Sequence, residues 1–185
     1  MRVYETIVDS DGHMSLTILV LLYSTNARIN GCEGGWIENA YKWAIERGGI
    51  EEEDNILRRF SIWCKLIQVA AVKVTRFYRL TEPDREKQMI DHVLAGGTLS
   101  VVVDASLWSY YRGGIFSGCT SKLQWNHGVN IVGVNVPGGY WIVRNSWGTG
   151  WGDNGYMYLA LVRDKQGYIE NERHFSNASR ADLSF

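Results

Sequence analysis

The sequence predicts an α+β fold in two lobes, because a helical pattern comes first along the chain and short strands come later. Residues 36–45 place apolar side chains at helical spacing, and Gly48-Gly49 ends the segment. From residue 99 onward the apolar segments are short, rich in β-branched and aromatic residues, and separated by glycine-rich turns. A helical part and a β-rich part are therefore expected.

A second helix is expected to begin within Thr81-Glu82-Pro83-Asp84, because proline is favoured in a first helical turn. Gly96-Gly97 would end it, and its apolar face would consist of Met89, Ile90, Val93 and Leu94. Residues 50–66, between the two helices, are interpreted as an irregular connection. Four strands are expected at residues 99–105, 128–135, 140–145 and 156–162.

The composition excludes several classes of function. The net charge is −1 with no basic block, so a nucleic-acid partner is not expected. The three cysteines, Cys32, Cys64 and Cys119, are an odd number and cannot all pair within the chain. Their spacing matches no zinc site, and neither a metal nor a cofactor is expected.

The longest aliphatic run near the start, residues 16–22, is far shorter than the roughly 20 apolar residues of a membrane span. It could be the apolar part of a signal peptide. However, Glu5, Asp9 and Asp11 precede it against a single Arg2, which is the wrong charge for such a leader. A buried strand or a misjoined segment is the favoured interpretation, and no convincing signal peptide is found.

Two residues at the ends of predicted strands could carry chemistry: His127 and Asn145. An imidazole titrates near neutrality and can move a proton. An asparagine oxygen can accept the other ring N–H and so fix the tautomer and orientation of the ring. Taken alone, such a pair is more often structural.

The segments around these residues favour a catalytic role over a structural one. GCEGGWIENAYKWAIERGGI, YYRGGIFSGC, NHGVNIVGV and YWIVRNSWGTGWGDNGYMYL occur in this order, from about Cys32 to about Leu161. Together they closely resemble the papain/cathepsin family of cysteine peptidases. The resemblance implies a papain-like two-lobe fold with a truncated helical lobe and an antiparallel, barrel-like β lobe. The implied division is an unmatched segment 1–31, a helical-lobe remnant 32–97 and a β-rich lobe 98–185.

The resemblance also implies roles for individual residues. Asn145 would orient a catalytic His127, and Trp147 would shield their hydrogen bond from water. Gly34 and Gly35 would present backbone to an extended substrate, while Trp151 would form the wall of the cleft on the leaving-group side. The main specificity pocket would be lined by Val102 and Gly128 and bordered by Trp125.

The family nucleophile is not found in these residues. Its motif, C-G-[SA]-C-[WY], lies about 130–150 residues before the histidine, and counting back from His127 leads to a point before Met1. By the family's disulfide pattern, Cys32, Cys64 and Cys119 would also lack their partners. Cys32 could replace the nucleophile, but the favoured interpretation is a cysteine that has lost its disulfide partner.

Three interpretations follow. The chain is a papain-like peptidase by family that is inactive as written, a non-catalytic homologue that binds peptides or partners, or an incomplete gene model. The resemblance implies peptide or protein substrates, a monomer, and a lysosomal or extracellular location.

Overall fold

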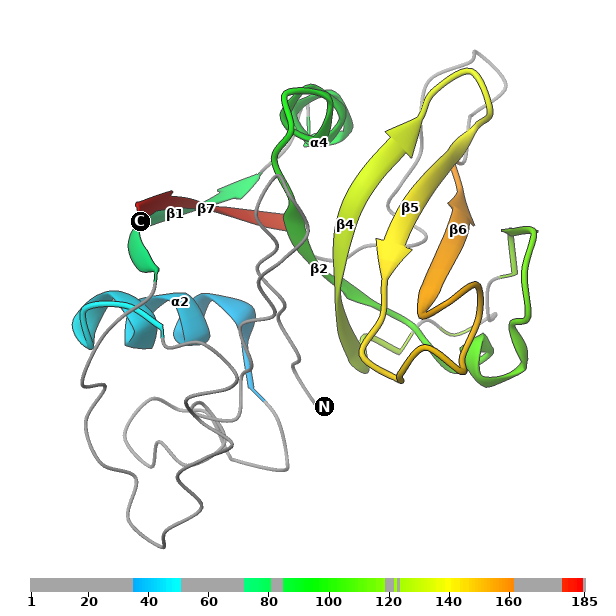
Figure 1. The fold of residues 1–185 in the computed structure, drawn as a ribbon, viewed down its shortest axis with the longest axis horizontal. Coiled ribbons are helices and arrows are strands. Elements are labelled where there is room, and N and C mark those ends of the chain that lie inside the picture. Colours follow the sequence, from blue (N-terminus) through cyan, green and yellow to red (C-terminus); the bar gives the residue numbers. More distant parts are fainter. Residues whose placement is uncertain are drawn as a thin grey trace, which may run out of the picture. The chain divides into compact units, whose positions relative to one another are not determined.

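The computed structural model describes residues 35–50, 72–80, 85–118, 122, 124–161 and 178–184. The chain divides into two units, one of Met1–Tyr78 with Ser179–Phe185 and the other of Arg79–Ala178. Each unit is described below by itself, and Figure 1 labels their helices and strands.

The first unit contains one described helix and parts of two strands. Helix α2 (Ile37–Glu46) buries one face, with Ile37, Ala40, Tyr41, Trp43 and Ala44. It ends where Gly48 takes a φ of 83°, which glycine adopts at little cost. Strands β1 (Lys73–Leu80) and β7 (Ala178–Ser184) are neighbours, and the Thr75 hydroxyl donates a hydrogen bond to Asp182 O at 3.0 Å. Tyr41 of the helix stacks on Phe77 of β1 with ring centroids 5.5 Å apart.

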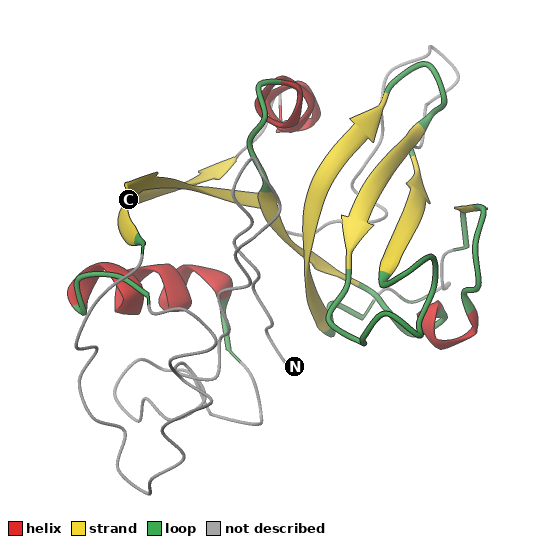
Figure 2. Ribbon diagram, in the orientation of Figure 1, coloured by secondary structure: helices red, strands yellow, loops and turns green. Residues whose placement is uncertain are grey.

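The second unit contains helix α4 (Arg85–Leu94) and five strands of the seven-stranded sheet. Figures 1 and 2 show these elements. In chain order the elements are β2 (Leu99–Val103), the short 3-10 helix η2 (Trp108–Tyr110), β3 (Ile115–Phe116), β4 (His127–Asn135), β5 (Tyr140–Arg144) and β6 (Tyr156–Ala160). In space the strand order is β2-β4-β5-β6-β3. All neighbours are antiparallel except β3 and β6, which are parallel.

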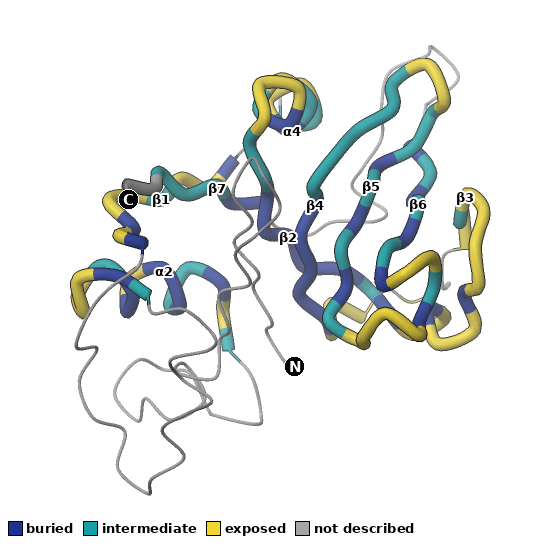
Figure 3. Tube along the Cα trace, viewed as in Figure 1, coloured by how far each residue is buried: buried dark blue, intermediate teal, exposed yellow. Residues whose placement is uncertain are grey.

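The core of the second unit lies along β2 and the middle of the sheet. Every residue of β2 is buried, as its dark tube in Figure 3 shows, and a sequence that is apolar except for Ser100 is typical of a strand covered on both faces. Helix α4 packs near β4 and contributes Met89 and Val93. The largest fully buried side chain is that of Trp141 in β5.

Strand β4 contains a β-bulge that keeps its apolar residues on one side. Ile131 is paired with Val143 and Gly133 with Ile142, so Val132 is one residue more than a regular ladder would hold. Regular alternation would place Ile131 and Val134 on opposite faces, because they are three residues apart. With the bulge, Ile131 is buried and Val134 still packs against the same core.

The structure confirms the α+β class, the first helix, and the four expected strands to within two residues at each end. Strands β1, β3 and β7 were not expected. Leu94 was wrongly placed on the apolar face of the second helix, since its side chain is 64% exposed. Five residues of helix turn Leu94 well away from Met89, whereas Val93, four residues on, stays on the same face.

The boundary between the two units falls at Tyr78 and Arg79, so α4 is grouped with the sheet, whereas the sequence analysis placed the division at residues 97 and 98. The apolar run 16–22, Thr81–Asp84 and nearly all of the connection 50–66 lie outside the described residues. Within the described parts of the chain, neither helix has the length and apolarity that a membrane crossing requires.

Candidate active site

The strand ends of the second unit bring His127 and Asn145 together. His127 is the first residue of β4, and its register partner is Val103, the last residue of β2. Asn145 directly follows β5, and its backbone N–H donates to Gly155 O at 3.0 Å, which fixes the start of the glycine-rich loop. Both side chains are therefore held by paired backbone, 18 residues apart in sequence.

The two side chains form a buried hydrogen bond. His127 Nε2 lies 2.8 Å from Asn145 Oδ1. His127 is 5% exposed and Asn145 is 8% exposed. Because water competes poorly at such a site, the bond holds the ring in one orientation.

The same amide oxygen determines the tautomer of the imidazole. Ser146 N lies 2.8 Å from Asn145 Oδ1 and is an obligatory donor, so the amide atom that faces it must be the oxygen. That oxygen can only accept, so His127 Nε2 must carry the proton that it receives. In the neutral ring, Nδ1 is then the basic nitrogen. No described residue hydrogen-bonds Nδ1, which leaves it able to take a proton.

Burial lowers the pKa of His127 from its ordinary value of 6.5, and the hydrogen bond to Asn145 acts in the opposite direction. Desolvation disfavours the imidazolium, while an oxygen that accepts the Nε2–H favours it. Desolvation is the larger effect, so the neutral ring is favoured in the folded chain.

Aromatic rings border the imidazole on two sides. The Trp147 ring lies 5.0 Å from the His127 ring, tilted by 34°, and is itself 39% exposed. The buried Trp108 from η2 meets the imidazole edge-on at 6.3 Å. Trp147 therefore stands between the pair and solvent, whereas Trp108 contacts the ring from the core. The sequence analysis did not identify Trp108, because nothing in LWSYYRGG marks a contact with a residue so far along the chain.

Trp151 is largely a core residue in this structure. It is 8% exposed, and its Nε1–H donates to Trp108 O at 3.0 Å. Its ring packs against those of Trp108, Tyr111 and Trp147 at 6.3, 5.6 and 5.2 Å. The tryptophan-rich loop is thereby anchored to the 3-10 helix and supports the Trp147 ring from behind.

Val102 and Gly128, expected to line a specificity pocket, are register partners in β2 and β4 and lie one position from the Val103–His127 pair. Val102 is 2% exposed, so its side chain belongs mainly to the interior. Trp125, two residues before His127, is 38% exposed and could border such a pocket.

The remaining expected residues are not part of this arrangement as described. Gly35 precedes α2 in the first unit, and Gly34, Cys32, Cys64 and Cys119 lie outside the described residues. No group of three or more potential metal ligands is present among the described residues. The chemistry that this geometry supports is proton transfer at Nδ1 of a ring that is oriented, shielded and neutral.

The family model for papain family cysteine protease matches residues 7–177 of the chain. This match extends on both sides beyond residues 32–161, the part of the chain in which the sequence motifs were found. Among curated relatives, "Cathepsin L 2" of Paramecium tetraurelia is 37% identical over 131 residues, which cover 70% of this chain and 40% of the relative. Human "Cathepsin L2" is 33% identical over 158 residues, which cover 80% of this chain and 47% of the relative.

Solved structures give the same picture for the fold. The bromelain protease from Ananas comosus, solved with the E64 inhibitor, superposes with a TM-score of 0.70 at 27% identity over 91% of this chain. A Carica candamarcensis cysteine protease in complex with E-64 gives a TM-score of 0.71 at 27% identity over 94% of this chain. These matches cover 78% and 79% of the two solved chains, respectively.

The comparisons agree on one fold and one family, and the chain spans only about two fifths of the length of the first Paramecium relative. The match to the family model covers most of the 185 residues, including the segment that carries His127 and Asn145. The chain belongs to the papain family of cysteine proteases.

Proposed function

We propose that this chain supplies the proton-transfer part of a papain-like cysteine peptidase, with His127 as the base and Asn145 as the residue that orients it. The observation that carries the proposal is the buried 2.8 Å hydrogen bond between His127 Nε2 and Asn145 Oδ1. This bond fixes Nδ1 as the proton acceptor, and a base oriented by a third group is the part of a triad that activates a nucleophile.

In the family's reaction, a cysteine thiol gives its proton to the histidine, and the sulfur attacks the carbonyl carbon of a peptide bond. The imidazolium then returns the proton to the leaving amine, so an acyl-enzyme forms that water later hydrolyses. In this chain Nδ1 of His127 would receive and return that proton. Trp147 would exclude water from the hydrogen bond with Asn145, in keeping with its ring 5.0 Å from the imidazole.

We further propose that the 185 residues by themselves do not cleave peptides. The motif C-G-[SA]-C-[WY] does not occur in them, and the cysteines lie instead in GCEGG, IWCKL and SGCTS. Without a thiolate at Nδ1, the base has nothing to activate. In a longer chain that carries the motif upstream, the same pair would be part of a working peptidase.

Peptides or proteins are the proposed substrates or binding partners. Gly34 and Gly35 would face an extended peptide backbone, Trp125, Val102 and Gly128 would form a specificity pocket, and Trp151 would support the wall on the leaving-group side. The cathepsin L names of the relatives support a lysosomal or extracellular site of action. A monomer is the proposed state.

The test is covalent labelling by an epoxide probe for active-site thiols, together with hydrolysis of a fluorogenic dipeptidyl substrate. The 185-residue chain should show neither. The same chain extended upstream by a nucleophile-bearing segment should show both, and His127→Ala in that longer chain should abolish hydrolysis.

Two outcomes contradict parts of this proposal. Labelling of the 185-residue chain, lost in His127→Ala, would show that one of its own cysteines is the nucleophile. Peptide affinity without turnover in the longer chain would favour the alternative, a non-catalytic homologue that binds peptides.

A further inference from the structure

Beyond the last paired residues of β2 and β4, Val103 and His127, the two segments stay together through one main-chain hydrogen bond and several bonds to side chains. The first bond past the ladder is between main-chain atoms, with Asn126 N donating to Val103 O at 3.1 Å. From there, Asp104, Ser106, Gln124 and Asn126 form a polar network, called the clasp below. It lies immediately before the catalytic candidate His127.

Asp104 bonds to both segments of the clasp at once. Its Oδ2 accepts a hydrogen bond from Gln124 N at 3.0 Å, on the segment that leads into β4. Its Oδ1 accepts from Ser106 N at 3.0 Å and from the Ser106 hydroxyl, on the segment that leaves β2. The carboxylate thus binds its own segment and a residue 20 positions away in sequence.

Asn126 makes the second crossing of the clasp. Its Oδ1 accepts from Ala105 N at 2.9 Å, and its Nδ2 donates to the Ser106 hydroxyl oxygen at 3.1 Å. The Ser106 hydroxyl therefore links the two crossings, since it donates to Asp104 and accepts from Asn126. The clasp depends on Asp104 at one end and on Asn126 at the other.

The clasp lies beyond the last paired residues of the ladder, where the main-chain hydrogen bond from Asn126 N to Val103 O joins the two segments. Gln124, Trp125 and Asn126 are exposed, and water competes for the hydrogen bonds of Gln124 N and Asn126 Nδ2, whereas the bond that Asn126 Oδ1 accepts from Ala105 N is partly buried. Hydrogen bonds to an ionised acceptor are about twice as strong as bonds between neutral groups, so the carboxylate is the strongest acceptor in the clasp. A catalytic side chain needs its supporting backbone held to within about 0.5 Å. Asp104 supplies the strongest acceptor among the groups that hold the backbone next to His127.

We propose that Asp104 is a positioning residue for His127: its carboxylate holds residues 104–106 against residues 124–126, and this fixes the entry into β4 so that the imidazole reaches Asn145. The role of this positioning in catalysis rests on the function proposed above. The positioning itself is a property of the imidazole that can be measured without any nucleophile.

The experiment follows the His127 Nε2 proton by ¹⁵N–¹H NMR in the full 185-residue chain. In the parent protein this proton is buried and hydrogen-bonded, so its signal should be resolved and slow to exchange with solvent. In Asp104→Ala the exchange rate should rise by about tenfold, because the strand ends open more often. In Asp104→Asn the exchange rate should rise less. The amide has the same volume as the carboxylate and keeps one oxygen acceptor for Ser106, but its NH2 group would face the donor Gln124 N.

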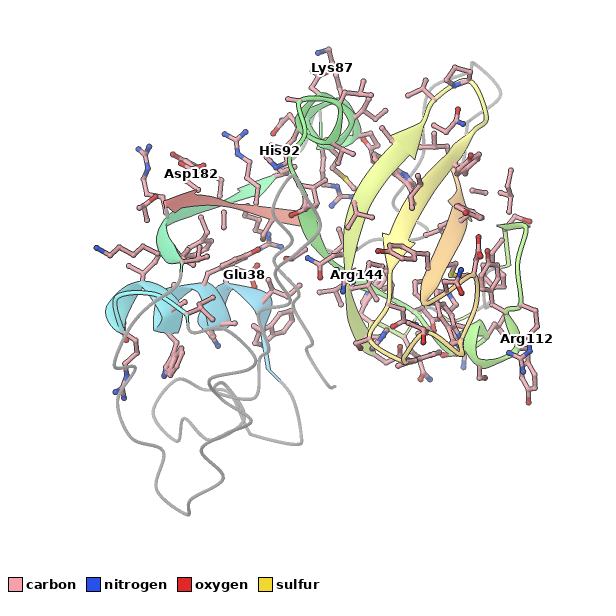
Figure 4. All side chains as sticks on the ribbon, viewed as in Figure 1. Glu38, Lys87, His92, Arg112, Arg144 and Asp182 are labelled. Atoms are coloured by element: carbon pink, nitrogen blue, oxygen red, sulfur yellow. The ribbon has the colours of Figure 1, made fainter. Side chains whose placement is uncertain are left out.

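The matched control is Asp91→Ala. Asp91 is an exposed aspartate on α4 that pairs with Lys87, a side chain that Figure 4 shows pointing away from the sheet. This variant removes the same charge from the same unit and should leave the exchange rate of the His127 proton unchanged.

A lower melting temperature in Asp104→Ala with an unchanged His127 signal would overturn the proposal, because it would show that the clasp only adds stability. Equal exchange rates in the Asp104 and Asp91 variants would overturn it as well. If Asp104→Ala does not fold, Asp104→Asn decides by the same comparison. Failure of the labelling experiment in the longer chain would reject the proposed function and would leave this result untouched.

Discussion

Oδ1 of Asn145 accepts two hydrogen bonds, one from the ring of His127 and one from Ser146 N. At the residue scale, this atom determines both the orientation of the imidazole and the nitrogen that carries its proton. A substitution at Asn145 should therefore change the pKa of His127. Whether the pKa rises or falls should depend on the acceptor that the new side chain provides.

Asn145→Ala should destabilise the fold by about 1–3 kcal/mol, because a buried ring N–H is left without its acceptor. It should also lower the pKa of His127 further, since the hydrogen bond that the ring donates to Asn145 now raises it. Asn145→Asp keeps an acceptor and adds a negative charge, so the pKa of His127 should rise instead. Urea unfolding and an NMR titration of His127 measure the two effects, and shifts of the same sign in both variants would contradict this account.

The lowered pKa of His127 predicts how stability depends on pH. The folded chain binds its proton at a lower pH than the unfolded chain, whose pKa is near 6.5. As the pH falls below 6.5 toward the folded pKa, the unfolded state gains the proton first, so the free energy of unfolding decreases. Stability from this group is thus fully present above 6.5 and is lost on acidification through that window.

The measurement is urea unfolding at about pH 5 and about pH 7.5 for the parent chain and for His127→Gln. The variant should lose less stability on acidification than the parent does. An equal loss in both proteins would show that other groups account for the acid sensitivity.

Sequence reasoning located His127 and Asn145 because each stands at the end of a predicted strand, and the family resemblance added Trp147. It missed Trp108, whose contact with His127 arises only when η2 folds back against β4. It also missed Asp104, which lay within the expected strand 99–105 and whose hydrogen bond to Gln124 N joins segments 20 residues apart. Contacts made across distant segments cannot be found from local patterns, and both of these are of that kind.

At the scale of elements, the glycine-rich loop after β5 shows two different uses of positive φ. Gly148 has a φ of 83° with nothing within 4 Å of an added Cβ. Gly152 has a φ of 59°, and an added Cβ would lie 2.5 Å from Tyr156 O, a main-chain atom that cannot move away by itself. A side chain would therefore have free space at Gly148 and none at Gly152, although both glycines have a positive φ.

Alanine substitutions at these positions form a matched pair. Gly148→Ala should cost roughly 1–2 kcal/mol, the ordinary penalty of a left-handed conformation for an L-residue. Gly152→Ala should cost at least about 1 kcal/mol more, because the main chain near Tyr156 must shift. Thermal unfolding of both variants measures the difference, and equal costs would contradict the close approach at Gly152.

The strands that sequence patterns predicted are those with continuous apolar or aromatic runs, such as β2 and β5. The missed strands lack that signal. β1 reads KVTRFYRL, with three of its eight residues charged, and β7 reads ASRADLS, with few residues of high strand propensity. β3 has two residues, which is too short for any period to appear. Tertiary pairing, rather than local preference, forms these three.

At the scale of the whole molecule, the buried cluster of the second unit runs from Leu80 to Ala178 and lies within residues 79–178. The His127–Asn145 pair and its aromatic neighbours lie in the same span. The fragment 79–178 should therefore fold and keep the protected His127 Nε2 proton. Near-ultraviolet circular dichroism, which reports the fixed environment of Trp141, and the NMR signal of that proton measure this outcome. A molten fragment would show that the first unit is needed for the site.

The extra residue in β4, Val132, adds one residue between His127 and the tip of the β4–β5 hairpin. Removing Val132 would leave Ile131 and Val134 two residues apart, so a regular ladder would place both on the same face and keep both halves of the strand in their present register. This single-codon deletion should therefore keep the His127 Nε2 proton signal, and loss of that signal would show that the local bend of the bulge, rather than the register, positions His127. Removing Gly138 from the turn should also leave the signal intact, because the shortened tip lies on the far side of the extra residue from His127.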